Sequence, residues 1–242
     1  MKRIAAVMGC VVVGSALLLS STPAFAGNLV LNGGFEDFDL KEGKRGRHTN
    51  WNYFDGQYLD SNKSELGWQV THGGTLEVRK SGVAGEAHDN SGYFMELDAH
   101  NYQRNVDPEE DLGIFQDIVT EAGKKYHLSF AYAARPGING DRNQFEVNFG
   151  EAFSQKLDGG NGQTQAGKDW KIFSTEIVAT SDITRLQFNY LGQRDTLGAH
   201  LDSVSVEAVP EPAFILGFLL FGMAGIGSMV KRKQFVVCGD AV

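Results

Sequence analysis

The 242-residue sequence has almost no cysteine, little proline and a deficit of basic residues. Its two cysteines, Cys10 and Cys238, lie near the two ends, so the central part has no disulfide, no thiol nucleophile and no cysteine-ligated metal. The chain has 22 Lys and Arg against 30 Asp and Glu, and the acidic excess is concentrated in its central part. Such a surface repels phosphate backbones, which excludes nucleic acid as a partner and favours calcium, cationic partners or neutral sugars.

Motifs of the common hydrolases and nucleotide-binding enzymes are also missing. There is no G-x-S-x-G, no H-E-x-x-H and no phosphate-binding loop, and the six histidines show no paired ligand spacing. We therefore expect a protein without catalytic activity. A glycosidase with two carboxylates leaves no linear motif, so a jelly-roll glycosidase stays as an alternative.

The first 26 residues have the features of a secretory signal peptide. Lys2 and Arg3 precede an apolar run over residues 4–19, and Ala24-Phe25-Ala26 is an A-x-A cleavage site. We expect signal peptidase to cut between Ala26 and Gly27 and the protein to be exported.

The C-terminal segment, residues 209–242, combines three features in a fixed order. Pro210-Glu211-Pro212 is followed by an apolar run over residues 213–230 and then by the basic cluster Lys231-Arg232-Lys233. A run of this length is sufficient for a membrane-spanning helix, and the cations after it keep that end in the cytoplasm. The order resembles the PEP-CTERM sorting tail. This resemblance implies an exosortase as a partner, a transient anchor in the inner membrane, and release to the cell envelope or the outside. The tail usually stops at the basic cluster, whereas here residues 234–242 follow.

Residues 27–208 are rich in glycine and contain short runs in which apolar and polar residues alternate. The alternation is clearest over residues 126–133, 145–149 and 186–190. One buried and one wet face is typical of antiparallel sheets, so we predict one all-β domain, an antiparallel β-sandwich of roughly ten strands. The other predicted strands span residues 28–31, 67–71, 75–79, 93–97, 114–119, 173–178 and 202–206.

Several short motifs in this domain resemble the galactose-binding-like jelly rolls, which include carbohydrate-binding modules and their cell-wall-associated relatives. The clearest is the opening Asn32-Gly33-Gly34-Phe35-Glu36, and Leu201-Asp202-Ser203-Val204 matches the last strand. Shorter matches are Gly67-Trp68-Gln69-Val70, Met95-Glu96-Leu97-Asp98 and Tyr126-His127-Leu128-Ser129-Phe130. The resemblance implies a jelly-roll fold in which the first and last strands lie near each other.

A structural calcium ion often joins these two strands in the family. The resemblance places Glu36 and Asp202 at the carboxylate positions, and Gly34 would let backbone oxygens come close. The alternative is that Glu36 caps a turn and Asp202 sits in a bulge. Asp98 is a weaker third candidate, because a carboxylate that ends a strand is often just solvated.

The longest segment without a strand pattern, residues 41–63, combines aromatic rings with amide and acidic groups. Sugar binding needs exposed rings for stacking beside groups that hydrogen-bond to hydroxyls. The candidate ligand-binding residues are Trp51, Tyr53, Asp55 and Tyr58 in this segment and Arg135 in another loop.

Most aromatic residues should belong to the core. Trp68 and Trp170 begin strand-like runs and are expected there, whereas burial and exposure of Trp51 are equally expected. The sequence thus favours an exported, non-catalytic protein that binds glycan or matrix polymer at the cell envelope. A structural or adhesive matrix protein without a defined ligand site is the main alternative.

Overall fold

The computed structural model describes residues 27–44, 49–71, 74–99, 112–162 and 169–210. The predicted signal peptide and the residues after Pro210 lie outside the described residues. Within the described ranges, no helix has the length and hydropathy that a membrane span requires.

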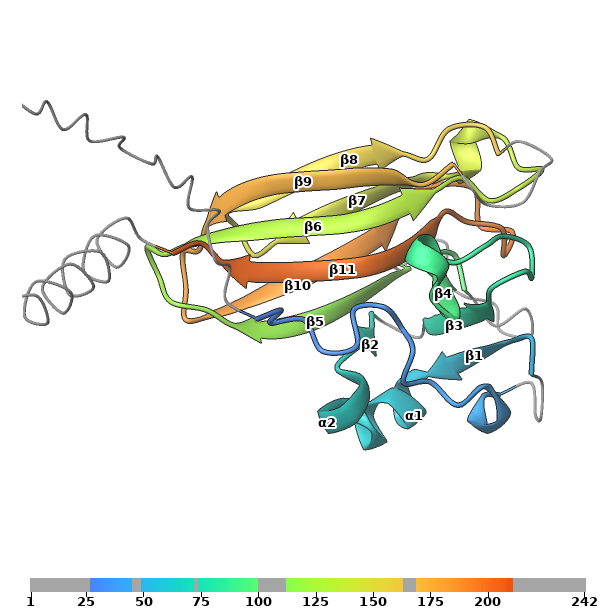
Figure 1. The fold of residues 1–242 in the computed structure, drawn as a ribbon, viewed down its shortest axis with the longest axis horizontal. Coiled ribbons are helices and arrows are strands. Elements are labelled where there is room, and N and C mark those ends of the chain that lie inside the picture. Colours follow the sequence, from blue (N-terminus) through green and yellow to red (C-terminus); the bar gives the residue numbers. More distant parts are fainter. Residues whose placement is uncertain (1–26, 45–48, 72–73, 100–111, 163–168, 211–242) are drawn as a thin grey trace, which may run out of the picture.

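Two antiparallel sheets pack face to face and form a β-sandwich, as the alternating runs predicted (Figure 1). One sheet has six strands in the order β1-β3-β4-β11-β6-β9, and the other has five in the order β2-β5-β10-β7-β8. The six-stranded sheet comprises β1 (Trp51–Asp55), β3 (Thr75–Lys80), β4 (Tyr93–Glu96), β11 (His200–Ala208), β6 (Lys125–Ala133) and β9 (Lys171–Val178). The five-stranded sheet comprises β2 (Gln69–Val70), β5 (Gly113–Val119), β10 (Ile183–Tyr190), β7 (Gln144–Phe149) and β8 (Phe153–Asp158).

Helices contribute little to the described chain. Two short α-helices, α1 (Gly56–Ser61) and α2 (Lys63–Leu66), follow β1. Asp55 caps α1 by accepting a hydrogen bond from the Tyr58 amide. Short 3₁₀ helices span Leu40–Glu42, His88–Asn90 and Gly140–Arg142.

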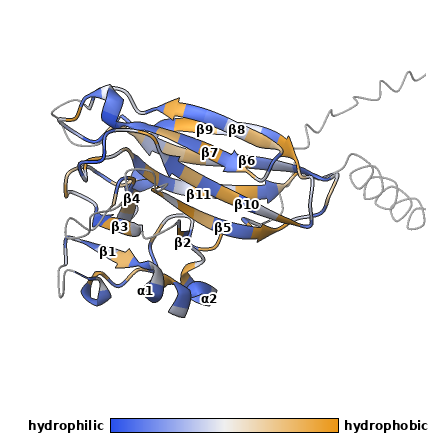
Figure 2. Ribbon diagram, turned by 180° about the vertical axis from the view of Figure 1, so that it is seen from behind, coloured by the Kyte–Doolittle hydropathy of each residue, from blue (hydrophilic) through white to orange (hydrophobic). Residues whose placement is uncertain are grey.

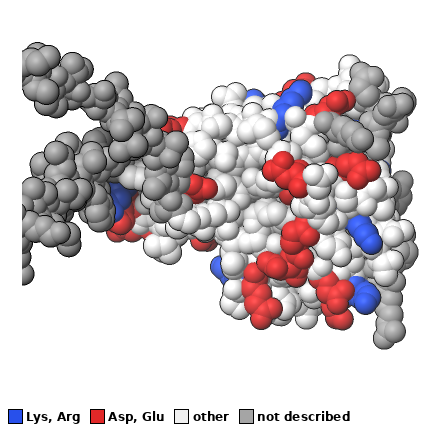
Figure 3. Space-filling view, in the orientation of Figure 1, with Lys and Arg blue, Asp and Glu red and all other residues white. Residues whose placement is uncertain are grey.

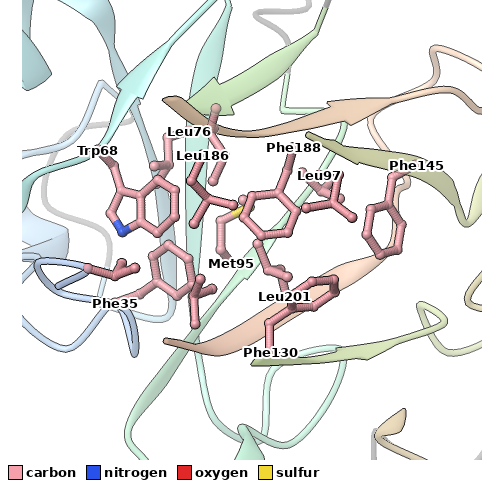
Figure 4. Close-up of a cluster of buried hydrophobic side chains, with 14 of the residues drawn as sticks. Phe35, Trp68, Leu76, Met95, Leu97, Phe130, Phe145, Leu186, Phe188 and Leu201 are labelled. Atoms are coloured by element: carbon pink, nitrogen blue, oxygen red, sulfur yellow. The ribbon is translucent and has the colours of Figure 1, made fainter. Parts of the chain in front are cut away.

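The core lies between the two sheets, and hydropathy alternates along the strands (Figure 2). Trp68 is completely buried, as expected, and its ring stacks on Phe35 at 5.4 Å (Figure 4). Deeper in the sandwich, Phe130 of one sheet meets Phe188 of the other edge to face at 5.0 Å. Interlocked rings of this kind hold the two sheets in one relative position.

The surface shows the acidic excess of the sequence. On the face that Figure 3 displays, acidic side chains predominate over basic ones, and several of them lie close together. This face therefore repels anionic polymers, in agreement with the charge balance of the chain.

The N-terminal prediction needs correction, because residues 28–31 form no regular strand. The Leu29 amide still donates to the Val206 carbonyl at 2.8 Å. The other bonds of this segment to β11 are made by the Asn28 side chain, which donates to the Val204 carbonyl and accepts from the Val206 amide. The first segment therefore lies beside the last strand, but a side chain rather than a backbone ladder joins them.

Candidate functional site

The Asn32-Gly33-Gly34-Phe35-Glu36 motif forms a tight loop against β11. A Cβ on Gly33 would lie 2.0 Å from the Val204 carbonyl oxygen, so only glycine allows this approach. The Val204 amide in turn donates to the Gly33 carbonyl at 2.9 Å. The contact falls at a bulge in β11, where its register with β6 shifts between Asp202 and Ser205.

The loop brings the three predicted metal residues together. A Cβ on Gly34 would lie 3.8 Å from Cγ of Glu36 and 4.0 Å from Oδ1 of Asp202. Glu36 Oε1 accepts hydrogen bonds from the Gly92 and Tyr93 amides, both at 2.8 Å. Glu36 therefore ties the N-terminal loop to the start of β4.

Asp202 is completely buried beside this loop. Its carboxylate accepts hydrogen bonds from the amides of Ser203 at 2.6 Å and His88 at 2.9 Å, and from the Ser91 hydroxyl at 3.2 Å. His88 and Ser91 come from the segment before β4. No sequence signal marked His88 or Ser91 as neighbours of Asp202.

The electrostatics of this pair are unfavourable without a cation. Burial, assisted by the charge of Glu36, raises the pKa of Asp202 to about 7, although its three hydrogen bonds act in the opposite direction. Among the described residues, neither Glu36 nor Asp202 forms an ion pair. Two neighbouring acidic groups without a cationic partner fit the charge that a divalent ion supplies.

Strained backbone surrounds the same place. Five of the eight described non-glycine residues with positive φ belong to the segments around Glu36 and Asp202. These are Asn32, Phe35, Asp89, Asn90 and Ser203. Asn and Asp adopt this conformation readily, so Phe35 and Ser203 are the two positions where it carries a larger cost. The described residues contain no group of three or more His, Cys, Asp or Glu side chains suited to a metal, so an ion here would also need carbonyl or hydroxyl oxygens.

Asp98 lies in a different environment. Its Oδ2 accepts hydrogen bonds from the amides of Asp195, Thr196 and Leu197, at 2.9, 2.7 and 3.2 Å. The carboxylate thus organises the loop before β11.

The predicted ligand-binding residues are divided between internal contacts and one sheet face. Asp55 pairs with Lys44 at 2.8 Å besides capping α1, and Tyr58 packs on Phe54 at 4.9 Å. Trp51 and Tyr53 are half-buried and share the outer face of β1. The guanidinium of Arg79 lies over the Trp51 ring at 5.2 Å, so Trp51 is part of a packed layer.

Arg135 belongs to a buried charge cluster on the same outer face of the six-stranded sheet. It pairs with Glu96, which is 1% exposed and also pairs with Arg79. Arg79 in addition contacts Glu77 at 2.6 Å, and the buried His200 ring lies 3.8 Å from Glu96. We call Glu77, Arg79, Glu96, Arg135 and His200 the charge cluster.

Loop residues cover the charge cluster. The half-buried Trp170 lies in this covering layer, outside the sandwich core, which corrects its expected place. Its indole donates to the Glu86 carbonyl at 2.9 Å, and its ring lies 6.5 Å from that of His200. The sequence indicated solvent-facing polar positions in β3 and β4, but this layer buries them.

The outer face of the five-stranded sheet is different, because exposed and half-buried amide side chains gather there. Register places Gln187 of β10 between Phe115 of β5 and Asn148 of β7, and Asn189 beside Glu146. Gln187 donates to Asn189 at 2.6 Å. We call Gln144, Glu146, Asn148, Gln187 and Asn189 the amide face.

The guanidinium group of Arg185 lies at the border of the amide face. Arg185 lies over the Phe115 ring at 3.8 Å and makes two hydrogen bonds to Asp117, at 2.7 and 2.9 Å. The hydrogen bonds and charge of Arg185 lower the pKa of Asp117, which keeps the pair ionised. The guanidinium is therefore held in place between Phe115 and Asp117, beside groups that can both donate to and accept from hydroxyls.

No family model and no curated protein matches the sequence. Comparison with solved structures finds weak likenesses. A CBM4 structure is 15% identical over 74% of this chain and 99% of its own, with a TM-score of 0.36. TmCBM61 in complex with β-1,4-galactotriose is 13% identical over 75% and 98%, with a TM-score of 0.40. The K2 cleaved adhesin domain of Lys-gingipain is 14% identical over 74% and 97%, with a TM-score of 0.38. At these values the likeness assigns neither a family nor a ligand.

Proposed function

We propose that the protein is an exported, non-catalytic carbohydrate-binding protein of the bacterial envelope, built on a galactose-binding-like jelly roll with a structural calcium ion. The observation that carries this proposal is the amide face. Each Gln or Asn offers donors and an acceptor at once, which matches the alternating needs of sugar hydroxyls. On the face and its border Glu146 lies opposite Lys156 of β8 and Asp117 pairs with Arg185, so the charges are balanced and a neutral glycan fits better than a strongly charged one.

Loss of single amides should weaken glycan binding. A glycan array would first identify the ligand, and calorimetry would then compare variants. Gln187→Ala and Asn148→Ala are each expected to weaken binding roughly tenfold, the effect of about 1–1.5 kcal/mol for one lost hydrogen bond. Both side chains are partly exposed on the sheet surface, so folding should be unaffected.

Two controls locate the site. Gln155→Ala removes an exposed amide of β8 whose only side-chain hydrogen bond in the described chain is to the neighbouring Lys156 carbonyl, and it should bind like wild type. Trp51→Ala tests the predicted set around β1. Weakening by Trp51→Ala with normal binding by Gln187→Ala would move the site to the six-stranded sheet. A protein that binds no glycan at all would instead be the structural matrix protein considered above.

The C-terminal segment adds a proposal about sorting. We propose that residues 213–230 anchor the precursor in the inner membrane and that an exosortase releases it near Pro210-Glu211-Pro212. The Val209 amide donates to the Lys125 carbonyl at 2.9 Å, so the folded domain extends to residue 209 and leaves little free chain before the motif.

Mass spectrometry of protein from the envelope or the medium tests both the signal-peptide cleavage and the C-terminal processing. The mature chain should begin at Gly27 and end no earlier than Val209. Replacing Pro210, Glu211 and Pro212 by alanine should leave a larger, membrane-bound form that retains Val242. Wild-type cells that keep Val242 at the inner membrane would show a permanent anchor and refute processing.

A further inference from the structure

Both described ends of the chain leave the sandwich at one pole. Leu29 bonds to Val206 near the end of β11, and Val209 bonds to Lys125 at the start of β6. The turns over residues 120–124 and 179–182 close the sandwich at the same end, where Figure 1 shows β11 ending and β6 beginning. We call this end the terminal pole.

Exposed aliphatic side chains gather at the terminal pole. Val119 is 77% exposed and Ile183 is 65% exposed, and they are direct cross-strand partners on the outer face of the five-stranded sheet. Val178, 48% exposed, lies opposite Lys125 on the other sheet, and Leu29 is 38% exposed. Four of the seven exposed large hydrophobic residues in the described chain thus surround one end, on both sides of the sandwich.

Both lysines at this pole are paired with acids: Lys124 contacts Glu121 at 2.6 Å, and Lys125 contacts Glu176 at 3.0 Å. Asp182 adds a further acid, which accepts a hydrogen bond from the Ala122 amide at 3.2 Å. Aliphatic side chains beside paired lysines and an extra acid fit a zwitterionic lipid surface better than an anionic one.

The short segment between the domain and the apolar run indicates what this surface contacts. Only three peptide steps separate Pro210 from the apolar run that begins at Ala213, a reach of about 10 Å at full extension. Pro210 and Pro212 favour an extended chain. If residues 213–230 lie in a bilayer, the terminal pole lies at the headgroups.

We propose that the terminal pole is a membrane-contact surface in the tail-bearing form, with Val119 and Ile183 in the interfacial layer of a zwitterionic bilayer. This inference rests on the membrane anchor proposed above and is independent of glycan binding. It gives the precursor one orientation: the strands stand away from the membrane, and the loops before β7 and β11 point outward.

Site-specific fluorescence tests the orientation. Protein beginning at Gly27 and retaining its C-terminal segment is reconstituted into vesicles of phosphatidylcholine and phosphatidylethanolamine, in a Cys238→Ser background. An environment-sensitive probe is attached at Val119→Cys or Ile183→Cys. The matched control is Leu191→Cys, which replaces a side chain that is 43% exposed and directly follows the opposite end of β10. Lipids with a quencher just below the headgroup should quench the probes at positions 119 and 183 several-fold more than the probe at 191.

Vesicle flotation separates the ways in which the inference could fail. Flotation with equal quenching at all three positions would leave the anchor intact and overturn the contact surface. Absence of flotation would overturn both the anchor and the contact. Glycan binding, measured on the same samples, reports on the amide face alone.

Discussion

Calcium is expected to raise the melting temperature of the protein by roughly 5–10 °C at pH 8. This corresponds to about 2.7 kcal/mol at a calcium concentration one hundred times the Kd, for a domain of this size. The reason is the pair of Glu36 and the buried Asp202, whose mutual repulsion a divalent ion would replace by attraction. Scanning calorimetry in calcium and in chelator measures the difference.

The response should depend on pH in a definite direction. Folding raises the pKa of Asp202 from 3.8 to about 7, so without calcium this group contributes a stability that is full below about pH 4 and is lost as the pH rises to about 7. Calcium needs the ionised carboxylate, so its apparent affinity should fall about 100-fold from pH 8 to pH 5. The pKa of the buried His200 is lowered by burial, which gives the opposite slope, so calcium and chelator must be compared at each pH.

The variant Glu36→Gln tests the effect of the negative charge of Glu36 while it keeps the size of the side chain. The amide oxygen of the substituted side chain can still accept from Gly92 and Tyr93, while the repulsion on Asp202 disappears. In chelator at pH 8 the variant should therefore be more stable than wild type, and its calcium response should vanish. Glu151→Gln, which changes an exposed acid in the turn before β8, should behave like wild type in both respects. Equal melting curves in calcium and chelator would contradict the ion site.

Glu96→Gln should destabilise the protein by about 3–5 kcal/mol, the range for breaking a buried ion pair. The substitution keeps the shape of the side chain but leaves Arg79 and Arg135 with Glu77 as the one carboxylate of the charge cluster. Chemical denaturation measures the free energy of unfolding.

A double variant provides the control. Arg135→Met in the Glu96→Gln background restores the balance of one cation and one anion, so it should recover part of the lost stability. Additive losses, or a Glu96→Gln loss below about 1 kcal/mol, would show that the cluster is not electrostatically coupled. Burial alone would raise the pKa of Glu96, but His200, Arg79 and Arg135 lower it overall. Its stabilising contribution is therefore present above pH 4.5, the ordinary pKa of the group, and is lost at lower pH as the carboxylate becomes protonated.

The sequence predicted the sandwich because most of its strands bury one face. Phe145, Val147 and Phe149 alternate with polar residues and are completely buried in β7. The edge strands β8 and β1 could not be predicted in this way, because their sequences do not show a clear alternation. In β8 only Phe153 and Leu157 are partly buried, so no alternation is visible. In β1 the buried Asn52 interrupts the apolar pattern, because its side chain donates to the Leu40 carbonyl at 2.7 Å.

Some of the site residues could be predicted from the sequence and others could not. Glu36, Gly34 and Asp202 belong to short motifs, so their proximity could be predicted, and the structure brings them together; calcium binding by them stays a prediction. The amide face could not, since Gln187, Asn148 and their neighbours look like ordinary solvent-facing positions of separate strands. Only the register of β5, β10 and β7 places them side by side.

The position of Val209 has a mechanical consequence. Val209 prolongs β11 by its bond to Lys125, and the ladder of β11 with β6 spans His200 to Ala208, with one bulge between Asp202 and Ser205. A pull on the tail therefore loads these hydrogen bonds in shear, all at once, because they lie perpendicular to the strand. Peeling, which breaks bonds one after another, would need a force across the strand. While the tail is anchored, tension between a glycan on the amide face and the membrane would be carried by the strongest geometry that a sheet offers.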